Sequence, residues 1–263
     1  MKNFTQKYEI WIFLILAPIV NIIFVYITTK GLLSDFAYDH GRFFLLLLLL
    51  LVVVLSTRGM SGIIEVFKPM FKWKVNPLWY VFSLLFAFSI ATITLVFKSF
   101  YTGTEFSSLF ELDLLHYKGV ITFLIWAFVG EVVWVSYSVR QLSKTTTLFY
   151  SSQIVGIFWT LWWLPIVFLN ISVISDLPVV ALLLNMMGAA GMCTFVYIKT
   201  KSGICVWLLQ FMLNISILIL PVSPAVGGAP TYTIFSIIYF VTMLAFMYFL
   251  NSKKVKKVKK TVN

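Results

Sequence analysis

The sequence predicts an all-α membrane protein, a polytopic bundle of about eight transmembrane helices with both termini in the cytoplasm. Three observations predict it: the composition, the length of the apolar segments and the placement of lysine and arginine. Of the 263 residues, 61% are apolar, 18% aromatic and only 11% charged. A soluble domain has roughly 45–50% apolar and 25% charged residues. Most side chains are therefore expected to face lipid or other helices rather than water.

The apolar residues gather in segments long enough to cross a bilayer. A hydrocarbon core about 30 Å thick requires about 20 apolar residues in a helix. Eight such segments occur, at approximately 8–28, 36–55, 78–97, 119–139, 148–169, 177–197, 203–221 and 232–250. The chain is thus expected to form one transmembrane bundle over 1–252, followed by a basic cytoplasmic tail over 253–263.

The first two segments are helices rather than a signal peptide or barrel strands. The apolar stretch at 8–28 is too long for a signal peptide, and no small-residue cleavage site follows Ile27–Lys30. The second segment contains an unbroken apolar run, Phe43–Leu55, whereas a barrel strand alternates apolar and polar residues. Helices are therefore predicted throughout.

The connections between segments carry their own signals. After the second segment, Gly62–Lys74 has aromatic residues and lysines at helical spacing, typical of a short helix in the membrane interface. A plain loop anchored by Trp73 and Trp79 is the alternative. Farther along, Gly188–Gly191 permits close helix approach, inside the bundle or between subunits. The prolines and glycines of 221–230 mark a turn.

Lysine and arginine orient the bundle. Of the 20 such residues, only four are counted with the connections after odd-numbered segments, namely Lys30, Arg42, Lys98 and Lys118. The rest lie near the N-terminus, on the even connections and in the tail. Because cytoplasmic loops carry the excess of lysine and arginine, both termini are predicted to be cytoplasmic. An odd number of segments would place the two basic ends on opposite faces, so the charges also support eight.

The net charge of +11 gathers at the predicted cytoplasmic edge, which indicates anionic lipid headgroups as a partner rather than nucleic acid. In Lys253–Lys260, each lysine near the surface adds roughly 1 kcal/mol of attraction to acidic lipid. The alternative is that these lysines only set the orientation.

The positions of the cysteines and histidines indicate neither a disulfide framework nor a metal site. Cys193 and Cys205 fall within or beside apolar segments, where a buried free thiol is the usual state. His40 and His116 are placed at the extracytoplasmic edge, far from both cysteines in segment order, so no zinc-type cluster is expected. We expect no metal and no cofactor.

A few polar residues within the segments are candidates for chemistry. Glu131 lies nine residues before Arg140, which places it roughly 13 Å below the cytoplasmic boundary. A charged side chain at mid-bilayer costs at least about 2.5 kcal/mol, so an embedded acid is a functional candidate. Gln210 and Asn214 are spaced i, i+4 and share one helix face. The functional interpretation groups Glu131, Gln210 and Asn214 in one polar pocket; the structural alternative makes them interhelical hydrogen bonds.

Three segments stand out in order along the chain. They are Gly130–Tyr137, with the sequence GEVVWVSY, Ile157–Ile166, with IFWTLWWLPI, and Gln210–Asn214, with QFMLN. They resemble the CPBP family of intramembrane proteases, also called the CAAX protease or Abi family, and residues 72–80 (KWKVNPLWY) are similar to that family as well. The resemblance covers the chain from the second connection to the seventh segment. It implies the same membrane fold, and we expect the bacterial plasma membrane as its location.

The resemblance also implies a site. Family members carry the motifs EExxxR, FxxxH and HxxxN, in which a glutamate and a histidine activate water and a His/Asn pair stabilises the oxyanion. In motif order, the corresponding positions hold Gly130, Glu131, Val135, Trp159, Trp163, Gln210 and Asn214. Only Glu131 and Asn214 keep the family's residue type.

The substitutes cannot supply the family's chemistry. Gly130 cannot take a proton, and the indole of Trp163 is only a donor, so neither acts as a base. Gln210 can still donate a hydrogen bond to an oxyanion. We therefore expect a catalytically degenerate member, a pseudoprotease. Its lateral membrane cavity, lined by Trp159, Trp162 and Trp163, would bind a membrane partner or a hydrophobic segment.

Two other hypotheses stay open. One is an active intramembrane endopeptidase, of the CAAX type or peptide-processing, in which Glu131, alone or with Gln210 and Asn214, handles the water. The other is a small transporter or a bacteriocin-immunity-type factor that neutralises a peptide toxin at the membrane. Peptide cleavage that is lost in E131Q would support the first. Proton-coupled flux in liposomes, or toxin sensitivity on deletion, would support the second.

Overall fold

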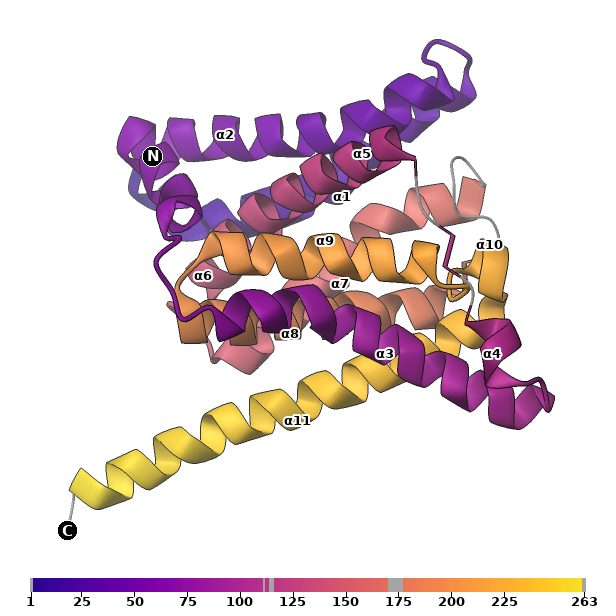
Figure 1. The fold of residues 1–263 in the computed structure, drawn as a ribbon. Coiled ribbons are helices and arrows are strands. Elements are labelled where there is room, and N and C mark those ends of the chain that lie inside the picture. Colours follow the sequence, from indigo (N-terminus) through magenta and orange to yellow (C-terminus); the bar gives the residue numbers. More distant parts are fainter. Residues whose placement is uncertain (1, 111, 114–115, 170–176, 262–263) are drawn as a thin grey trace.

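The computed structural model describes residues 2–110, 112–113, 116–169 and 177–261, and it confirms the predicted fold class. In this described part, eight helices are long and apolar enough to cross a membrane. They form one bundle, with the two chain ends at the same end of it (Figure 1). We call this the terminal end and the opposite one the distal end.

The helices agree closely with the predicted segments. The long ones are α1 (Lys2–Thr29), α2 (Asp35–Phe67), α3 (Leu78–Thr102), α5 (Tyr117–Gly130), α7 (Leu148–Leu169), α8 (Val179–Thr200), α9 (Gly203–Ile219) and α11 (Ala229–Thr261). The short ones are the 3₁₀ turn η1 (Lys68–Phe71), α4 (Phe106–Leu109), the π-helix η2 (Glu131–Val139), α6 (Arg140–Leu142) and α10 (Pro224–Gly227). The fourth crossing is therefore composite, because α5 runs on through η2 and α6. The last helix is longer than the predicted segment, because α11 continues past residue 250 into the tail, whereas the candidate span ends at Leu250.

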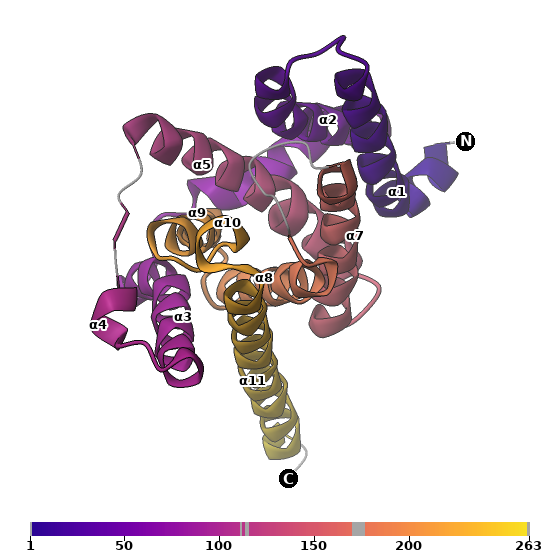
Figure 2. The same ribbon diagram turned by 90° about the vertical axis from the view of Figure 1, so that its right-hand side faces the viewer.

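Helix α8 lies at the centre of the bundle, with α7 and α11 against it (Figure 2). Glycines allow the close approach: a Cβ at Gly156 of α7 would lie 2.6 Å from Cα of Met187, and one at Gly188 would lie 3.3 Å from Cα of Phe240 in α11. A Cβ at Gly191 would meet the side chain of Met243, also on α11. The Gly188–Gly191 patch thus serves packing inside the bundle.

Helix α2 turns sharply at Gly59. The backbone angles there are φ 67° and ψ −161°, a region that is essentially restricted to glycine. After this turn the chain is helical again up to Phe67 and then forms η1. The helical alternative for the connection after the second segment is therefore confirmed over these residues, whereas residues 72–77 form no helix.

Charged side chains tie three helices together at the terminal end. Arg58 places Nη2 2.9 Å from Oε1 of Glu9 in α1 and Nη1 2.8 Å from Oε2 of Glu65. Arg140 of α6 lies 3.3 Å from Glu65 Oε1, and the Tyr137 hydroxyl of η2 donates to Glu9 Oε1 at 2.9 Å. We refer to these five residues as the charged clasp. The turn at Gly59 brings Glu65 back toward Arg58, which stands just before the turn.

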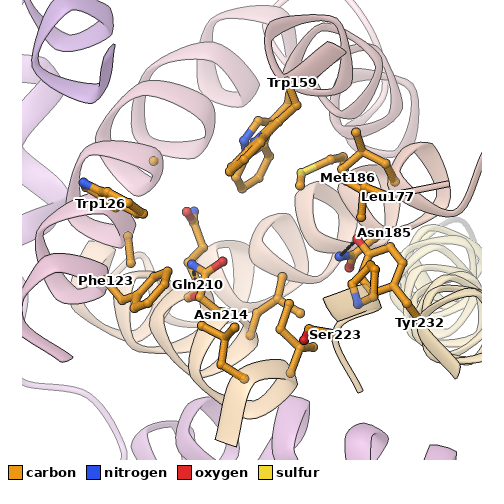
Figure 3. Close-up of a pocket in the computed structure, with 18 of the residues that line it drawn as sticks. Phe123, Trp126, Trp159, Leu177, Asn185, Met186, Gln210, Asn214, Ser223 and Tyr232 are labelled. Carbon is orange, nitrogen blue, oxygen red and sulfur yellow. Dashed lines mark hydrogen bonds between the residues drawn. The ribbon is translucent and has the colours of Figure 1, made fainter. Parts of the chain in front are cut away.

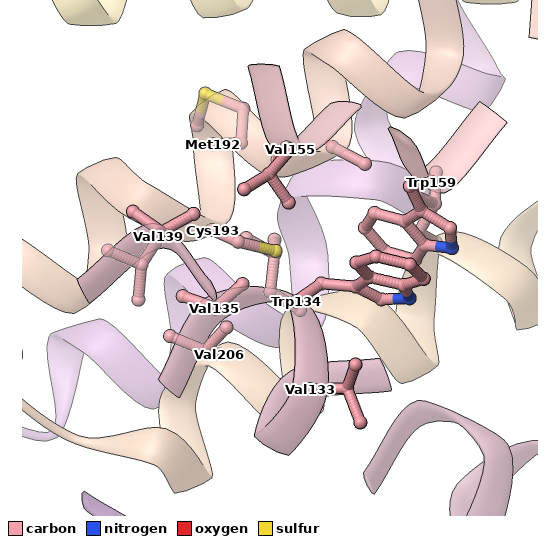
Figure 4. Close-up of a cluster of buried hydrophobic side chains, with 14 of the residues drawn as sticks. Val133, Trp134, Val135, Val139, Val155, Trp159, Met192, Cys193 and Val206 are labelled. Carbon is pink, nitrogen blue, oxygen red and sulfur yellow. The ribbon is translucent and has the colours of Figure 1, made fainter. Parts of the chain in front are cut away.

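The π-helix η2 forms the buried middle of the bundle. All nine of its residues are buried. Trp134 stacks on Trp159 of α7, with ring centroids 5.7 Å apart, and Val135 packs among apolar neighbours that include Cys193 and Val206 (Figure 4). Both cysteines of the chain are free and buried, as predicted. π-Helices are rare and occur frequently at functional sites.

Candidate functional site

A cavity of about 300 Å³ opens between α2, α5, α7, α8 and α9 toward the distal end. Most of its wall is apolar, and a small number of amide and hydroxyl groups point into it (Figure 3). The polar lining residues are Arg42, Trp126, Trp159, Trp163, Asn185, Gln210, Asn214, Ser223 and Tyr232. A concave, mainly apolar pocket with few polar groups is the usual form of a small-ligand site.

Five of the seven motif positions converge on this cavity. Gly130 of α5, Trp159 and Trp163 of α7, and Gln210 and Asn214 of α9 all line it. Oε1 of Gln210 lies only 2.6 Å from the place where a Cβ at Gly130 would stand. The amide of Asn214 donates to the backbone oxygen of Gln210 at 3.1 Å. Three segments that are distant in the sequence thus contribute to one wall.

Glu131 does not line the cavity, so the prediction that it shares a polar pocket with Gln210 and Asn214 is wrong in that respect. Its side chain is fully buried. Oε1 accepts a hydrogen bond from the Ser136 hydroxyl at 2.7 Å and lies 3.1 Å from the place of a Cβ at Gly203, the first residue of α9. Successive residues of a helix differ by about 100° in direction. Gly130 therefore faces the cavity, whereas Glu131 faces the start of α9, where the helix dipole favours an acid.

Two other predicted positions also lie outside the cavity. Val135 is buried in the apolar cluster of η2. Trp162 is absent from the cavity wall, contrary to the prediction, and its ring packs edge-to-face against Phe43 and Trp134. Its backbone oxygen accepts a hydrogen bond from Asn21 of α1 at 2.6 Å. Trp162 therefore joins α7 to the neighbouring helices rather than contacting a ligand.

The chemical capacity of the cavity follows from its polar groups. Among the described residues, no Asp, Glu, His or Cys lines it. Asn185 donates to the Tyr232 hydroxyl at 2.8 Å, and the amides of Gln210 and Asn214 are neutral. Such groups donate and accept hydrogen bonds but do not take up a proton near neutral pH. The cavity wall can therefore orient and bind a ligand, and it offers no general base.

Arg42 is the residue of this site that the sequence interpretation missed. It was counted with a connection, but it lies inside α2, is only 3% exposed and lines the cavity. Its guanidinium carbon lies 4.4 Å from the ring centroid of Trp163. A signal was present, because an arginine at position 42 falls inside the apolar segment 36–55. Glu9 at 5% exposure was missed in the same way, in the segment 8–28.

Several donors at the cavity have no hydrogen-bond partner in the described part of the chain. They are Nε and Nη1 of Arg42, Nε1 of Trp163, Nε2 of Gln210 and Oγ of Ser223; the one comparable acceptor is Oδ1 of Asn185. A buried polar group without a partner costs about 1–3 kcal/mol, and more when it is charged. The cavity therefore has an excess of donors.

Comparison with known proteins gives no family assignment, because neither a family model nor a curated protein matches the chain. The resemblance to the CPBP proteases therefore rests on the motif segments.

Proposed function

We propose that the chain is a catalytically degenerate relative of the CPBP-type intramembrane proteases, located in the bacterial plasma membrane. In this proposal its cavity binds a membrane partner or a hydrophobic segment and does not cleave it. One observation carries the proposal: four positions that match catalytic residues of the family, Gly130, Trp163, Gln210 and Asn214, line a single cavity within the bundle.

The convergence supports the relationship because the residues lie far apart in the sequence. Gly130, Trp163 and Gln210 belong to α5, α7 and α9. Their spacing along the chain does not by itself bring them together. A fold that retains the geometry of an ancestral site would place them on one wall even after the catalytic side chains have been replaced.

The replacements argue against hydrolysis. A positioned general base or acid typically contributes 10²–10⁴-fold to a rate, and the wall residues named above offer none. Gln210 and Asn214 can still donate hydrogen bonds toward a carbonyl oxygen. Donors without a base can hold a carbonyl group but leave water unactivated, which favours binding over cleavage.

The first test measures cleavage. Purified protein in lipid nanodiscs is incubated with fluorescent single-span peptides, in parallel with E131Q. We expect no cleavage above the background of empty nanodiscs for either protein, because the Glu131 carboxyl is held by Ser136 away from the cavity. Cleavage by the unmodified protein that disappears in E131Q would overturn the proposal in favour of an endopeptidase.

The second test measures binding with the same peptides carrying a photoreactive group. Ala225 lies at the exposed rim of the cavity on α10, so A225W is expected to obstruct the opening and reduce crosslinking at least about fivefold. The matched control is S107W, at an exposed position of α4 outside the cavity, and it should crosslink as the unmodified protein does. Equal crosslinking in both variants would contradict binding in the cavity.

A further inference from the structure

We propose that the ligand of this cavity is a single-chain lipid acid, whose carboxylate or phosphate group pairs with Arg42 while its acyl chain occupies the apolar wall. This inference rests on the proposed function, in which the cavity binds a membrane partner without cleaving it, and it names a lipid as that partner. It is argued from the burial of Arg42, its surroundings, the donors beside it and the shape of the remaining wall.

Arg42 is a cation placed inside a membrane-spanning helix. It lies seven residues after the start of α2 at Asp35, so it stands roughly 10 Å along the helix from the distal end. A buried charge in a transmembrane segment marks a functional site by default, together with a partner that neutralises it. Among the described residues, no carboxylate oxygen lies within ion-pair distance of its guanidinium.

Asp39, one turn earlier in α2, is an acid close enough to interact electrostatically with Arg42, but it forms no ion pair with it. Aromatic rings surround the guanidinium instead. Its central carbon lies 4.4 Å from the ring centroid of Trp163, and four further rings lie between 5.1 and 5.6 Å. Those four rings belong to Tyr38, Phe43, Trp126 and Trp162. Cation–π contacts stabilise a desolvated cation without neutralising it. The cage therefore keeps Arg42 charged and in place while it remains able to bind an anion.

The cage is itself held rigidly. The amide of Asn21 donates to the backbone oxygen of Trp162 at 2.6 Å, and its oxygen accepts from the Tyr38 hydroxyl at 3.1 Å. One side chain of α1 thus fixes a ring from α2 and the backbone of α7. A preorganised donor binds an anion without first losing conformational freedom.

The free donors indicate an anion as the missing partner. Nε and Nη1 of Arg42 and Nε1 of Trp163 are buried and have no partner among the described residues. Both residues line the cavity, and Arg42 is more than nine-tenths buried. A carboxylate or phosphate group accepts hydrogen bonds only, and charge-assisted bonds from an arginine are the strong ones. A neutral headgroup such as an alcohol would leave the guanidinium without an ion-pair partner at hydrogen-bond distance.

The rest of the wall favours an acyl chain over an extended peptide. The lining beyond Arg42 is largely hydrophobic, including Phe123, Leu182, Met186 and Leu213. An extended peptide carries a backbone N–H donor and a C=O acceptor in nearly every residue. Apolar surroundings leave these groups unpaired, at a high free-energy cost. An acyl chain has no polar group to satisfy, and it can enter beside Val226, a lining residue that is 64% exposed.

The test uses a palmitic acid that carries a diazirine and an alkyne, together with the matched alcohol, on the full-length protein in nanodiscs. We expect the acid to label the cavity helices at least about tenfold more than the alcohol at equal concentration. Unlabelled palmitate and a lysophosphatidic acid should compete, whereas acetate and inorganic phosphate should not. R42Q should reduce labelling by the acid to the level of the alcohol. K30Q, which removes an exposed cation at the same end of the bundle, should not change it.

The outcomes separate this inference from the proposed function. Equal labelling by acid and alcohol, or competition by acetate or phosphate alone, would overturn the acid-lipid assignment and leave the peptide-binding test unaffected. A third outcome is that neither probe labels the protein while the peptides still crosslink and A225W blocks that crosslinking. This outcome would also overturn the acid-lipid assignment, and it would favour a peptide ligand. The elution profile and thermal unfolding of R42Q show whether that variant folds. If it does not fold, the comparison of the acid with the alcohol on the unmodified protein decides whether the ligand is a lipid acid.

Discussion

The R58A variant is expected to lose about 3 kcal/mol of unfolding free energy, because removing one partner of a buried ion pair leaves the other charge uncompensated. Arg58 is the centre of the charged clasp, with ion-pair contacts of 2.9 Å to Glu9 and 2.8 Å to Glu65. Glu9 is only 5% exposed, so water cannot replace the guanidinium easily. Its remaining partners are the hydroxyls of Tyr137 and Thr57. Unfolding can be followed by intrinsic fluorescence during denaturation in mixed micelles.

Two further variants show whether the loss of stability comes from the unpaired carboxylate of Glu9. In the double variant E9Q/R58A the buried side chain is neutral, so about half of the stability should return. K144A serves as the surface control, since Lys144 is 58% exposed and lies 4.0 Å from Glu65; exposed pairs are typically worth less than 1 kcal/mol. If R58A and K144A destabilised the protein equally, the clasp would not be the buried ion pair described above.

The G156A variant is expected to be destabilised by about 2 kcal/mol, since forcing extra volume into a packed core typically costs 1–3 kcal/mol. A Cβ at this position would lie 2.6 Å from Cα and 2.9 Å from the backbone nitrogen of Met187. Backbone atoms cannot rotate away, so α7 and α8 must separate. The higher helix propensity of alanine, about 1 kcal/mol, offsets only part of this cost. The same denaturation measurement reports the change.

Helix α7 also carries Trp159 and Trp163, so separation from α8 should alter ligand binding as well as stability. G41A is the matched control: its added Cβ would meet only the ring edge of Phe24, at 3.2 Å, and that side chain can shift. We expect its unfolding free energy to remain within about 0.5 kcal/mol of the unmodified protein. A G156A protein as stable as G41A would show that the two helices do not touch at Gly156.

The helices were predictable because their signal is local. A run of about 20 apolar residues identifies a crossing wherever it stands, and all eight appear in the described part of the chain. The turn at Gly59 and the π-helix from Glu131 were not predicted. Both depend on backbone angles and hydrogen-bond register, which composition does not report. The same limit explains the error at Glu131, since adjacent residues of a helix face different neighbours.

The site was only partly predictable. The motif segments identified Gly130, Gln210 and Asn214, and the structure brings them to one cavity. Arg42 was missed because the sequence interpretation used lysine and arginine only to orient the bundle. A charged side chain inside an apolar segment is costly whether it is an acid, such as Glu131, or a cation, such as Arg42. Its aromatic cage, however, joins α2, α5 and α7, and no spacing along one segment indicates such a contact.

The depth of Arg42 has an electrical consequence. With both termini cytoplasmic, as the distribution of lysine and arginine predicts, α2 begins at the outer face. An anion that reaches the guanidinium from outside then crosses about a third of a 30 Å hydrocarbon core. A full crossing changes the energy of one charge by about 2.3 kcal/mol per 100 mV, so this partial crossing changes it by about 0.8 kcal/mol. An inside-negative potential opposes the entry of the anion. The binding constant for the anion would then rise about fourfold when an energised cell loses 100 mV of potential, which makes the caged arginine responsive to the energy state of the membrane.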